Sequence, residues 1–552
     1  MRNKTKVIVI GIDGGTFDLI LPWVGKGYLP NFEKLINKGS WGNLNSGPLS
    51  HTAACWSSFI TGCNLGKHGI NEFFVMQRVG NKNIPKQIST FDRMKPSLWS
   101  IISRQNKKVA VFNVPLTYPP EEVNGILVSG FQTPPNATDF TYPPSVKDKL
   151  DELTGGYSIY AQNINPETSL QKYLTAAYEV TEKQFKAVNY FLKKGDWDFF
   201  MYVFQESDHL QHFYWHFMDE THPQHSPDNI FREAILGIYK KIDGYLGDIL
   251  KELDNNTVLI IISDHGFGPI YNQFWLNNWL LKEEYLRLKT NFDGLLRRLL
   301  LKLGVCWPDF FNFFLRDSFI GKLRSLFTGK EVQKKMRYFY TFKHIDWSKT
   351  KAYCLGYNQL SINLKGREPE GMVNPGKEYE ELKDELIEKL KKIISPVTHK
   401  PMMTEIYRKE KLFHGELLDI LPDIIYVCDN FKTLSLSGYK IGSSKITDKP
   451  FHHTGYHRKE GIIILYGTPF KENQKIEGTQ LIDLAPIILS LLKLDIPKHM
   501  DGKILKSCFV HPDDVYERYV EIKEEKITKK EDIYSKEDTR GIEERLKSLG
   551  YL

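Results

Sequence analysis

The chain has 552 residues, 41% of them hydrophobic and 26% charged, with a net charge of +7 at pH 7. These values are typical of globular proteins, and the length predicts about two to four structural units. The modest positive charge suits an anionic substrate but is too small to predict specific nucleic-acid binding. The six cysteines include no Cys-x-x-Cys pair, which gives no support to zinc-finger or thioredoxin-like motifs and favours a reducing compartment.

The N-terminal segment begins with basic and polar residues and turns apolar from Val7 to Ile12. This run is too short for a signal peptide and leads into Asp13-Gly14-Gly15, so it predicts the first buried strand of a sheet. No stretch approaches the roughly 18 uninterrupted apolar residues that a membrane span needs. We therefore expect a cytoplasmic protein.

Short apolar runs rich in β-branched and aromatic residues recur along the chain, with helical patterns between them. They are Lys6–Ile12, Lys108–Val114, Asp198–Phe204, Thr257–Ile262, Asp423–Cys428 and Gly461–Gly467. Continuous apolar strands that alternate with helices predict an α/β fold with a mostly parallel central sheet covered on both faces. Ligands of such sheets bind beyond the carboxyl ends of the strands, so polar residues at those ends are candidate functional residues.

Two regions depart from this alternation. Residues 281–346 contain a basic amphipathic run and an aromatic cluster, which predict an inserted helical cap. The cap could govern substrate choice or contact a membrane surface, or it could be a plain helical lid packed on the core. The predicted units are a first part of the catalytic core at 1–280, the cap at 281–346, a second part of the core at 347–508 and a charged C-terminal tail at 509–552.

Three of the predicted strands lead into residues that commonly bind metal ions. Asp13 follows the first strand and precedes two glycines, a pattern that by itself is above all typical of a turn. Asp208 and His212 follow the third strand four residues apart, so in a helix they share one face and can hold one ion. Asp264 and His265 end the fourth strand, where a cation would satisfy a pair that is costly to bury without a partner.

A histidine-rich segment precedes the last predicted strand. His452, His453 and His457 lie close together there, and the chemistry of imidazole alone leaves open which of them is a ligand. Mixed sets of carboxylates and imidazoles suit zinc, manganese or iron. Three aspartates and three histidines would form two metal sites a few ångströms apart, an arrangement that supports phosphoryl transfer.

Hydroxyl and thiol groups gather around a predicted helix over 53–60. Thr52 lies just ahead of this helix, where exposed backbone N–H groups favour a nucleophilic oxygen. Taken alone, Thr52 would be interpreted as an ordinary N-cap. Cys55, Ser57 and Ser58 are rival nucleophiles, but the serines would lie more than a turn inside the helix, and a thiolate would form a poor intermediate for turnover.

Taken in order, these segments resemble the alkaline phosphatase superfamily. The resemblance is strongest to its type I phosphodiesterase/nucleotide pyrophosphatase branch and the predicted phosphohydrolase/phosphomutase proteins allied to it. The segments are Gly11–Gly14, Thr52–Gly62, Gly66–Ile70, Glu206–Asp208 with His212, Ser263–Gly266, Gly455–Gly461 and Ile482–Pro486. The resemblance covers most of the chain apart from 281–346 and the extreme tail. It implies a three-layer alkaline-phosphatase-like core.

The resemblance also implies roles for individual residues. It implies one metal site formed by Asp208, His212 and His457, and a second formed by Asp13, Asp264 and His265, with Thr52 placed on the second metal as the nucleophile. It selects His457 because the matching histidine stands before Arg-x-Glu-Gly-Ile. The chain departs from nucleotide pyrophosphatases at Cys55, where those enzymes carry an asparagine that helps to hold the phosphoryl oxygen. The sequence lacks the Cys-x-Pro-x-Arg signature of sulfatases.

The sequence therefore predicts a phosphodiesterase or phosphatase that depends on two divalent metal ions, zinc or manganese, and acts through a phospho-threonine intermediate on Thr52. The same residues could serve a phosphomutase or phosphotransferase, and a non-catalytic binding protein on this scaffold is the third alternative. The expected partner is a phosphate-ester substrate, whether a small molecule, a nucleotide or a group linked to lipid or glycan. The sequence predicts neither the physiological substrate nor the oligomeric state.

Overall fold

The structure is a computed structural model that describes residues 5–79, 82–161, 164, 166, 169–290, 344–437, 445–450, 453–522 and 533–549. Its largest element is a 10-stranded sheet in the order β20-β2-β19-β9-β1-β8-β5-β6-β7, with β21 also paired to β2. The strands are β1 (Lys6–Ile12), β2 (Gly39–Asn45), β5 (Val109–Val114), β6 (Gly125–Ser129), β7 (Thr141–Tyr142), β8 (Phe199–Phe204), β9 (Thr257–Ile262), β19 (Glu460–Tyr466), β20 (Gln474–Lys475) and β21 (Thr479–Gln480).

The centre of this sheet is parallel and its outer part is mixed. β9, β1, β8, β5 and β6 run parallel to one another. β19 runs antiparallel to both of its neighbours, β2 and β9, and β7 runs antiparallel to β6. The predicted α/β class is confirmed, and the parallel direction holds for the strands that end at the candidate site.

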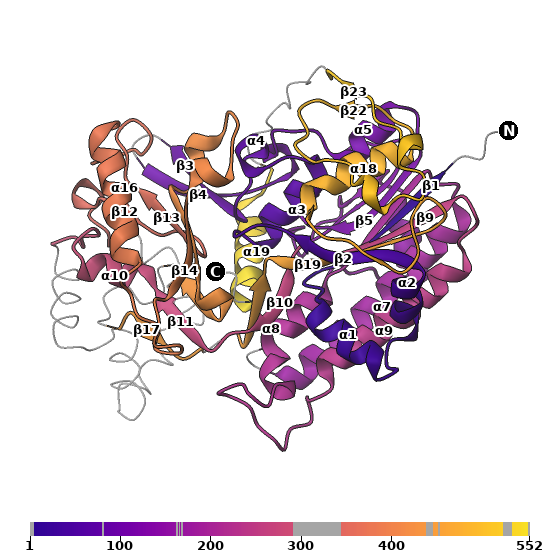
Figure 1. Ribbon diagram of the computed structural model, residues 1–552, viewed down its shortest axis with the longest axis horizontal. Helices are drawn as coiled ribbons and strands as arrows, with labels where there is room; N and C mark the ends of the chain where they lie inside the picture. Colours follow the sequence, from indigo (N-terminus) through magenta and orange to yellow (C-terminus); the bar gives the residue numbers. More distant parts are fainter. Residues whose placement is uncertain are drawn as a thin grey trace.

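Both faces of the sheet are covered, which gives three layers (Figure 1). In β1, the side chains of Ile8 and Ile10 pack into one hydrophobic cluster, whereas those of Val7 and Val9 pack into the other. This alternation explains the continuous apolar run, because a strand buried on both faces needs apolar residues at every position. The three-layer arrangement expected from the resemblance is present.

The helices of the core divide between these faces (Figure 1). Those on the first face are α1 (Phe17–Gly25), α2 (Pro30–Asn37), α6 (Val146–Thr154), α7 (Leu170–Lys194), α8 (Glu206–Met218) and α9 (Ala234–Lys251). Those on the second face are α3 (Thr52–Thr61), α5 (Leu98–Arg104) and α18 (Leu484–Leu491). α3 and α8 begin at the carboxyl-end side of the sheet and carry candidate site residues.

A smaller unit, which we call the accessory module, comprises the described residues from Asn272 to Asp448 and has its own hydrophobic core. It contains a four-stranded sheet, β12-β13-β15-β14, and a three-stranded sheet, β16-β11-β17. Its elements are β11 (Asn272–Trp275), α10 (Leu276–Lys282), β12 (Ala352–Tyr353), β13 (Gln359–Ile362), α16 (Lys377–Leu390), β14 (Met403–Arg408), α17 (Lys409–Leu412), β15 (Ile424–Cys428), β16 (Thr433–Leu436) and β17 (Thr447–Asp448). The predicted strand 423–428 is therefore a strand, but it lies outside the large sheet.

The remaining elements are small or peripheral. They are α4 (Leu65–His68), β3 (Phe74–Val79), β4 (Lys82–Gln87), β10 (Gly266–Pro269), β18 (Gly455–Arg458), β22 (Ile496–Pro497), β23 (Tyr519–Val520) and α19 (Lys536–Ser548). α19 lies in the segment predicted as a charged tail, yet it buries Ile542 and Leu546 in the first-face cluster. Most of the predicted cap, 291–343, lies outside the described residues.

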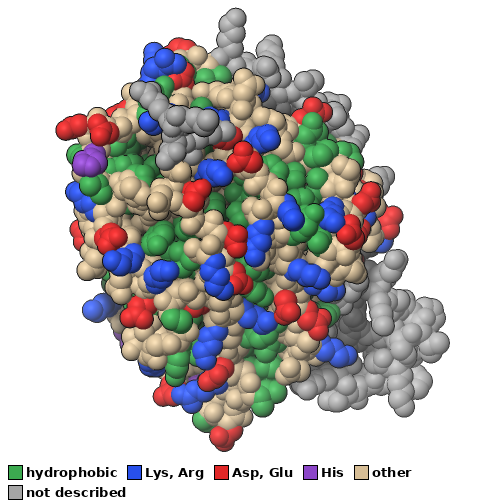
Figure 2. Space-filling view, turned by 90° about the vertical axis from the view of Figure 1, so that its right-hand side faces the viewer, with side chains coloured by type: hydrophobic (Ala, Val, Ile, Leu, Met, Phe, Trp, Pro, Cys, Tyr) green, Lys and Arg blue, Asp and Glu red, His purple; other side chains and the backbone are tan. Residues whose placement is uncertain are grey.

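The described helices include none that is long and apolar enough to cross a membrane. On the face seen in Figure 2, basic and acidic side chains are intermixed rather than gathered by sign. The division of the chain into domains stays a prediction.

Candidate functional site

The carboxyl ends of three neighbouring parallel strands meet at one place. In the strand register, Ile12 of β1 pairs with Phe204 of β8, and Gly11 pairs with Ile262 of β9. The residues that follow these strands therefore emerge side by side. They bring together Asp13 after β1, Asp208 and His212 from α8, and Asp264 with His265 after β9, while His457 arrives from β18.

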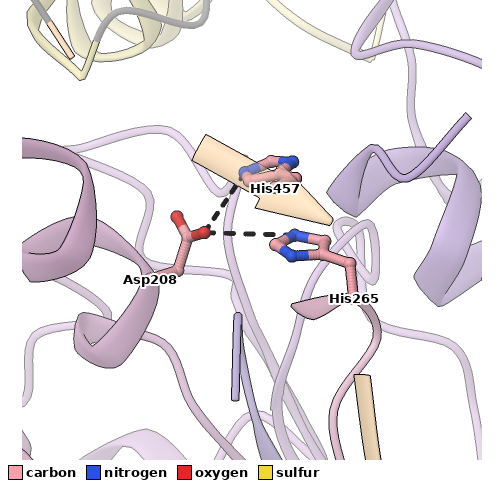
Figure 3. A group of neighbouring side chains, drawn as sticks. All are labelled: Asp208, His265 and His457. Atoms are coloured by element: carbon pink, nitrogen blue, oxygen red, sulfur yellow. Dashed lines mark ion pairs between the residues drawn. The ribbon is translucent and has the colours of Figure 1, made fainter. Parts of the chain in front are cut away.

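Five of these side chains, all but His212, form two overlapping groups in which the candidate ligand atoms lie within 4.8 Å of one another. One group contains Asp13, Asp264 and His265, the set predicted for one metal. The other contains Asp208, His457 and again His265, whose ring faces the same Asp208 oxygen as His457 does (Figure 3). Every one of these side chains is buried, so water cannot solvate their charges.

His212 was expected to share an ion with Asp208 and His457, and it lies beside both. Its Nε2 is 3.3 Å from Asp208 Oδ2 and 3.1 Å from His457 Nε2. His265 Nε2 is 3.6 Å from Asp13 Oδ1 and 3.3 Å from Asp264 Oδ2. The structure thus brings all six predicted ligands into one cluster, with His265 at its centre.

The backbone fixes the orientation of all three imidazoles. Nδ1 of His212 lies 3.0 Å from the Gly455 carbonyl, and Nδ1 of His457 lies 2.8 Å from the Ser50 carbonyl. Nδ1 of His265 likewise lies 3.1 Å from a carbonyl, that of Gly266. Because a carbonyl oxygen can only accept, each Nδ1 carries the hydrogen, and each Nε2 lone pair points into the cluster. This is the usual orientation of histidines that bind a metal.

The carboxylates crowd one another. Burial raises the pKa of both Asp13 and Asp264, and repulsion from the neighbouring carboxylates adds to the effect. Burial also tends to raise the pKa of Asp208, but the His212 and His457 imidazoles more than offset it and leave this pKa below its usual range. Burial lowers the pKa of His265 to about 4, so this imidazole is neutral at physiological pH.

The donor set fits divalent cations. Asp13 Oδ1 and Asp264 Oδ2 are buried and accept no hydrogen bond from the described residues. Together with the inward-facing imidazole lone pairs, they present electron pairs to one another, an arrangement that is costly without a cation between them. Oxygen and nitrogen donors in equal number suit zinc or manganese.

Glycines and a tryptophan shape the Asp13 loop. The Nε1–H of Trp56 donates to Asp13 Oδ2 at 3.1 Å, and the Gly14 N–H donates to Asp264 Oδ1 at 3.3 Å. A Cβ at Gly11 would lie 2.7 Å from the Trp56 ring, so only glycine leaves room for that ring. Gly14 has a φ of +67°, which favours glycine as well. The Gly-x-Asp-Gly pattern therefore holds the carboxylate in place.

Thr52 is the first residue of α3, and His51 is the N-cap, so the helix begins one residue earlier than predicted. Thr52 Oγ1 lies 3.2 Å from His265 Nε2, inside the cluster. Of its rivals, Ser58 Oγ pairs with His68 at 3.1 Å. The Cys55 thiol points to the Leu49 carbonyl, and burial raises its pKa. Thr52 is thus the hydroxyl of α3 that contacts a candidate ligand.

The remaining histidine candidate of the last segment has a different position. His453 stacks on the His212 ring at 4.2 Å between centroids, and its Nε2–H donates to the Leu549 carbonyl, which follows α19, at 2.5 Å. It lies behind a predicted ligand rather than within the two groups. His452 lies outside the described residues.

Sequence reasoning missed a second pair of titratable side chains beside Thr52, formed by the buried His51 and the partly buried Glu72. His51 Nε2 lies 3.2 Å from Glu72 Oε2. Burial raises the pKa of Glu72 to about 8 and lowers that of His51 to about 3. The signal that could have found Glu72 is its place two residues after the resembling segment Gly66–Ile70, where a carboxylate precedes two phenylalanines.

Three solved structures illustrate the similarities of this chain. Human ectonucleotide pyrophosphatase/phosphodiesterase 5 is 15% identical with a TM-score of 0.47, over 92% of this chain and 99% of that one. An inactive variant of the murine protein in complex with AMP is 15% identical with a TM-score of 0.46, over 89% and 96%. Phosphonoacetate hydrolase from Sinorhizobium meliloti 1021 in complex with phosphonoacetate is 11% identical with a TM-score of 0.49, over 89% and 96%.

No curated protein matches the chain. The family model of type I phosphodiesterase/nucleotide pyrophosphatase, however, matches residues 7–442, well over half of the sequence. That stretch contains Asp13, Thr52, Asp208 and Asp264, and it ends shortly before His457. The chain therefore belongs to the type I phosphodiesterase/nucleotide pyrophosphatase family.

Proposed function

We propose that the chain hydrolyses phosphate esters at this cluster, with Thr52 as the nucleophile and two divalent metal ions as cofactors. One observation carries the proposal: three inward-facing imidazole nitrogens and three buried carboxylates converge next to the Thr52 hydroxyl. Asp13, Asp264 and His265 would hold one ion beside Thr52. Asp208, His212 and His457 would hold the other.

The proposed reaction has two displacements at phosphorus. Thr52 Oγ1 forms a bond to phosphorus while the bond to the leaving oxygen breaks, the Thr52 proton passes to solvent, and the leaving group takes a proton from water. A water molecule then attacks phosphorus, which frees Thr52 and releases the phosphate product. Bound divalent ions would lower the pKa of the attacking hydroxyl and offset charge on the leaving oxygen.

The residues of the chain supply the positioning. As the first residue of α3, Thr52 is held next to the exposed N–H groups of the first helical turn, which can donate to a phosphoryl oxygen. Burial of the cluster lowers the effective dielectric constant around it, which strengthens each charge interaction at the reacting atoms. The apolar strands beneath it keep the ligands at fixed separations.

We also propose zinc or manganese as the metal and a reducing compartment as the location. The oxygen and nitrogen donor set supports the metals. The five described cysteines are all buried thiols without a disulfide, which supports the compartment.

The test combines a metal analysis with a substrate panel. The purified chain, loaded with Zn²⁺ or Mn²⁺, is assayed with bis-p-nitrophenyl phosphate and with p-nitrophenyl phosphate. We expect turnover of at least one of them, lost on chelation and in Thr52→Ala. Turnover that requires an added alcohol would instead favour a phosphotransferase. Metal binding with no turnover of either compound would favour a binding protein.

A further inference from the structure

We propose that His51 donates a hydrogen bond to the phosphoryl group during the reaction and that Glu72 and Gln359 position it. The proposal rests on the function proposed above and assigns a residue that the resemblance does not. His51 would be a catalytic residue, because it touches the substrate. Glu72 and Gln359 would act through it.

The first step is the location of the imidazole. His51 immediately precedes Thr52 and is 5% exposed. Its ring centroid lies 6.2 Å from that of His457, so it stands beside the proposed metal centre. Phe73 meets it edge to face at 4.9 Å, and Tyr357 stacks on it at 6.0 Å. These rings hold the imidazole in one orientation next to the nucleophile.

The second step is the need for a donor. A phosphoryl group on Thr52 exposes non-bridging oxygens that gain charge in the transition state, and a fixed donor there lowers the barrier. Cys55 does not serve, because its thiol points to the Leu49 carbonyl within the hydrophobic core. His51 lies one residue before the nucleophile and has a polar hydrogen to offer.

The third step is the orientation of that hydrogen. Glu72 Oε2 occupies the Nε2 side of the ring at 3.2 Å. The His51 and Glu72 side chains are only 6% and 18% exposed, so the pair is least costly without net charge and shares one proton between Nε2 and the carboxyl. Whether this proton lies on Nε2 or on the Glu72 carboxyl, the His51 Nδ1 carries a hydrogen. Glu72 thereby makes Nδ1 the donor that can face the phosphoryl group.

The fourth step is how Glu72 itself is held. The Gln359 amide donates to Glu72 Oε1 at 3.0 Å, and the Asn71 amide donates to Gln359 Oε1 at 3.3 Å. A Cβ at Gly356 would lie 1.7 Å from Gln359 Nε2 and 2.2 Å from Glu72 Oε1, so this glycine leaves room for both groups. Gly356, Tyr357 and Gln359 all belong to the accessory module. The accessory module therefore contributes residues to the part of the site where His51 lies.

The experiment compares variants that keep or remove the donor. His51→Phe keeps a ring between Tyr357 and Phe73 but cannot donate, whereas His51→Gln keeps an N–H group. We expect His51→Phe to lower kcat about 100-fold with little change in KM, the scale of one lost donor, and His51→Gln to recover at least about tenfold of that loss. His511→Phe changes an exposed histidine and is the matched control.

A thio-substitution separates hydrogen bonding from mere distortion. Sulfur accepts hydrogen bonds weakly. The two enantiomers of O-methyl O-p-nitrophenyl phosphorothioate, which is chiral only at phosphorus, place sulfur in one or the other non-bridging position. With one of them, the loss of kcat caused by His51→Phe should be at least about tenfold smaller than with the oxygen ester. The reason is that sulfur already weakens the hydrogen bond from His51 in the parent protein. A distorted site would slow both enantiomers and the oxygen ester alike, which would refute the proposal.

Variants of Glu72 provide an independent test if His51→Phe fails to fold. Glu72→Gln can still donate to Nε2 and should keep kcat within about threefold of the parent. Glu72→Leu should lose about tenfold in kcat and show the same preference between the two enantiomers as His51→Phe. Equal rates for Glu72→Leu and the parent would overturn the positioning role. If His51→Phe is fully active while Thr52→Ala is inactive, this inference fails and the proposed hydrolase stands. If the parent turns over no phosphoester, both fail.

Discussion

His212 Nε2 and His457 Nε2 lie 3.1 Å apart, and the Nδ1 of each ring donates to a backbone carbonyl. Two lone pairs therefore face each other across a distance at which they repel. A proton or a metal ion between them removes the repulsion. Asp208, 3.3 Å from His212 and 3.2 Å from His457, supplies the negative charge that favours a cation there.

The first prediction concerns metal content. We expect about two bound transition-metal ions per chain, because five of the six candidate ligands form two groups that share only His265. Asp208→Ala and Asp264→Ala should each lower the metal content and abolish phosphoesterase activity. Elemental analysis of the dialysed proteins measures this. Full metal content in both variants would show that these aspartates are not ligands.

The second prediction concerns the nucleophile. Thr52→Ala removes an oxygen 3.2 Å from His265 but leaves the six candidate ligands in place. It should keep both metals and the fold while losing at least ~100-fold in rate. Thr52→Ser, which keeps the hydroxyl, is the control and should retain much more activity. Near-normal turnover by Thr52→Ala, or phosphate trapped on Ser57 or Ser58 in a mass spectrum, would contradict the assignment.

The third prediction concerns stability and pH. Burial raises the pKa of Glu72 to about 8, whereas a glutamate in an unfolded chain titrates near about 4.3. Between these values the folded state binds the extra proton, so stability falls as the pH rises, by at most about 1.4 kcal/mol per pH unit. Glu72→Gln cannot ionise. Relative to the parent, it should therefore be more stable at pH 8 than at pH 5 in denaturant titrations.

A matched variant isolates this effect. Glu477→Gln removes an exposed carboxyl and should change the pH dependence little. If the stability difference between parent and Glu72→Gln is the same at pH 5 and pH 8, then Glu72 titrates normally in the folded protein.

The fourth prediction concerns the C-terminal helix. Leu546 is fully buried in the first-face cluster, so Leu546→Ala should lower the free energy of unfolding by about 2–5 kcal/mol. Glu537→Ala on the exposed side of α19 should change it by less than about 0.5 kcal/mol. Equal small effects in chemical denaturation would mean that α19 does not pack on the core.

The candidate ligands could be predicted because their positions are encoded locally. A fully apolar run predicts a doubly covered strand, and its carboxyl end marks where Asp13, Asp264 and His265 must lie. The Asp208 and His212 spacing likewise depends only on the pitch of one helix. The sheet and most of the site follow from such short-range patterns.

Other features depend on contacts between residues far apart in the sequence, which no local pattern predicts. Gln359 reaches Glu72 across 287 residues, and nothing around either residue indicates the other. The strand at 424–428 has the same apolar character as the core strands but pairs within the accessory module. The antiparallel direction of β19 could not be predicted from the sequence either, because an apolar strand has the same composition in a parallel and in an antiparallel pairing.

The position of β19 has a consequence for synthesis of the protein on the ribosome. β19 lies between β2 and β9, although it is made long after both. Until residue 466 has emerged, β2 and β9 each present an open edge that can pair with another chain. A recombinant fragment ending at 442, where the family match stops, would keep both edges open and lack His457. The central sheet of this protein can therefore close only when the last sixth of the chain is being made.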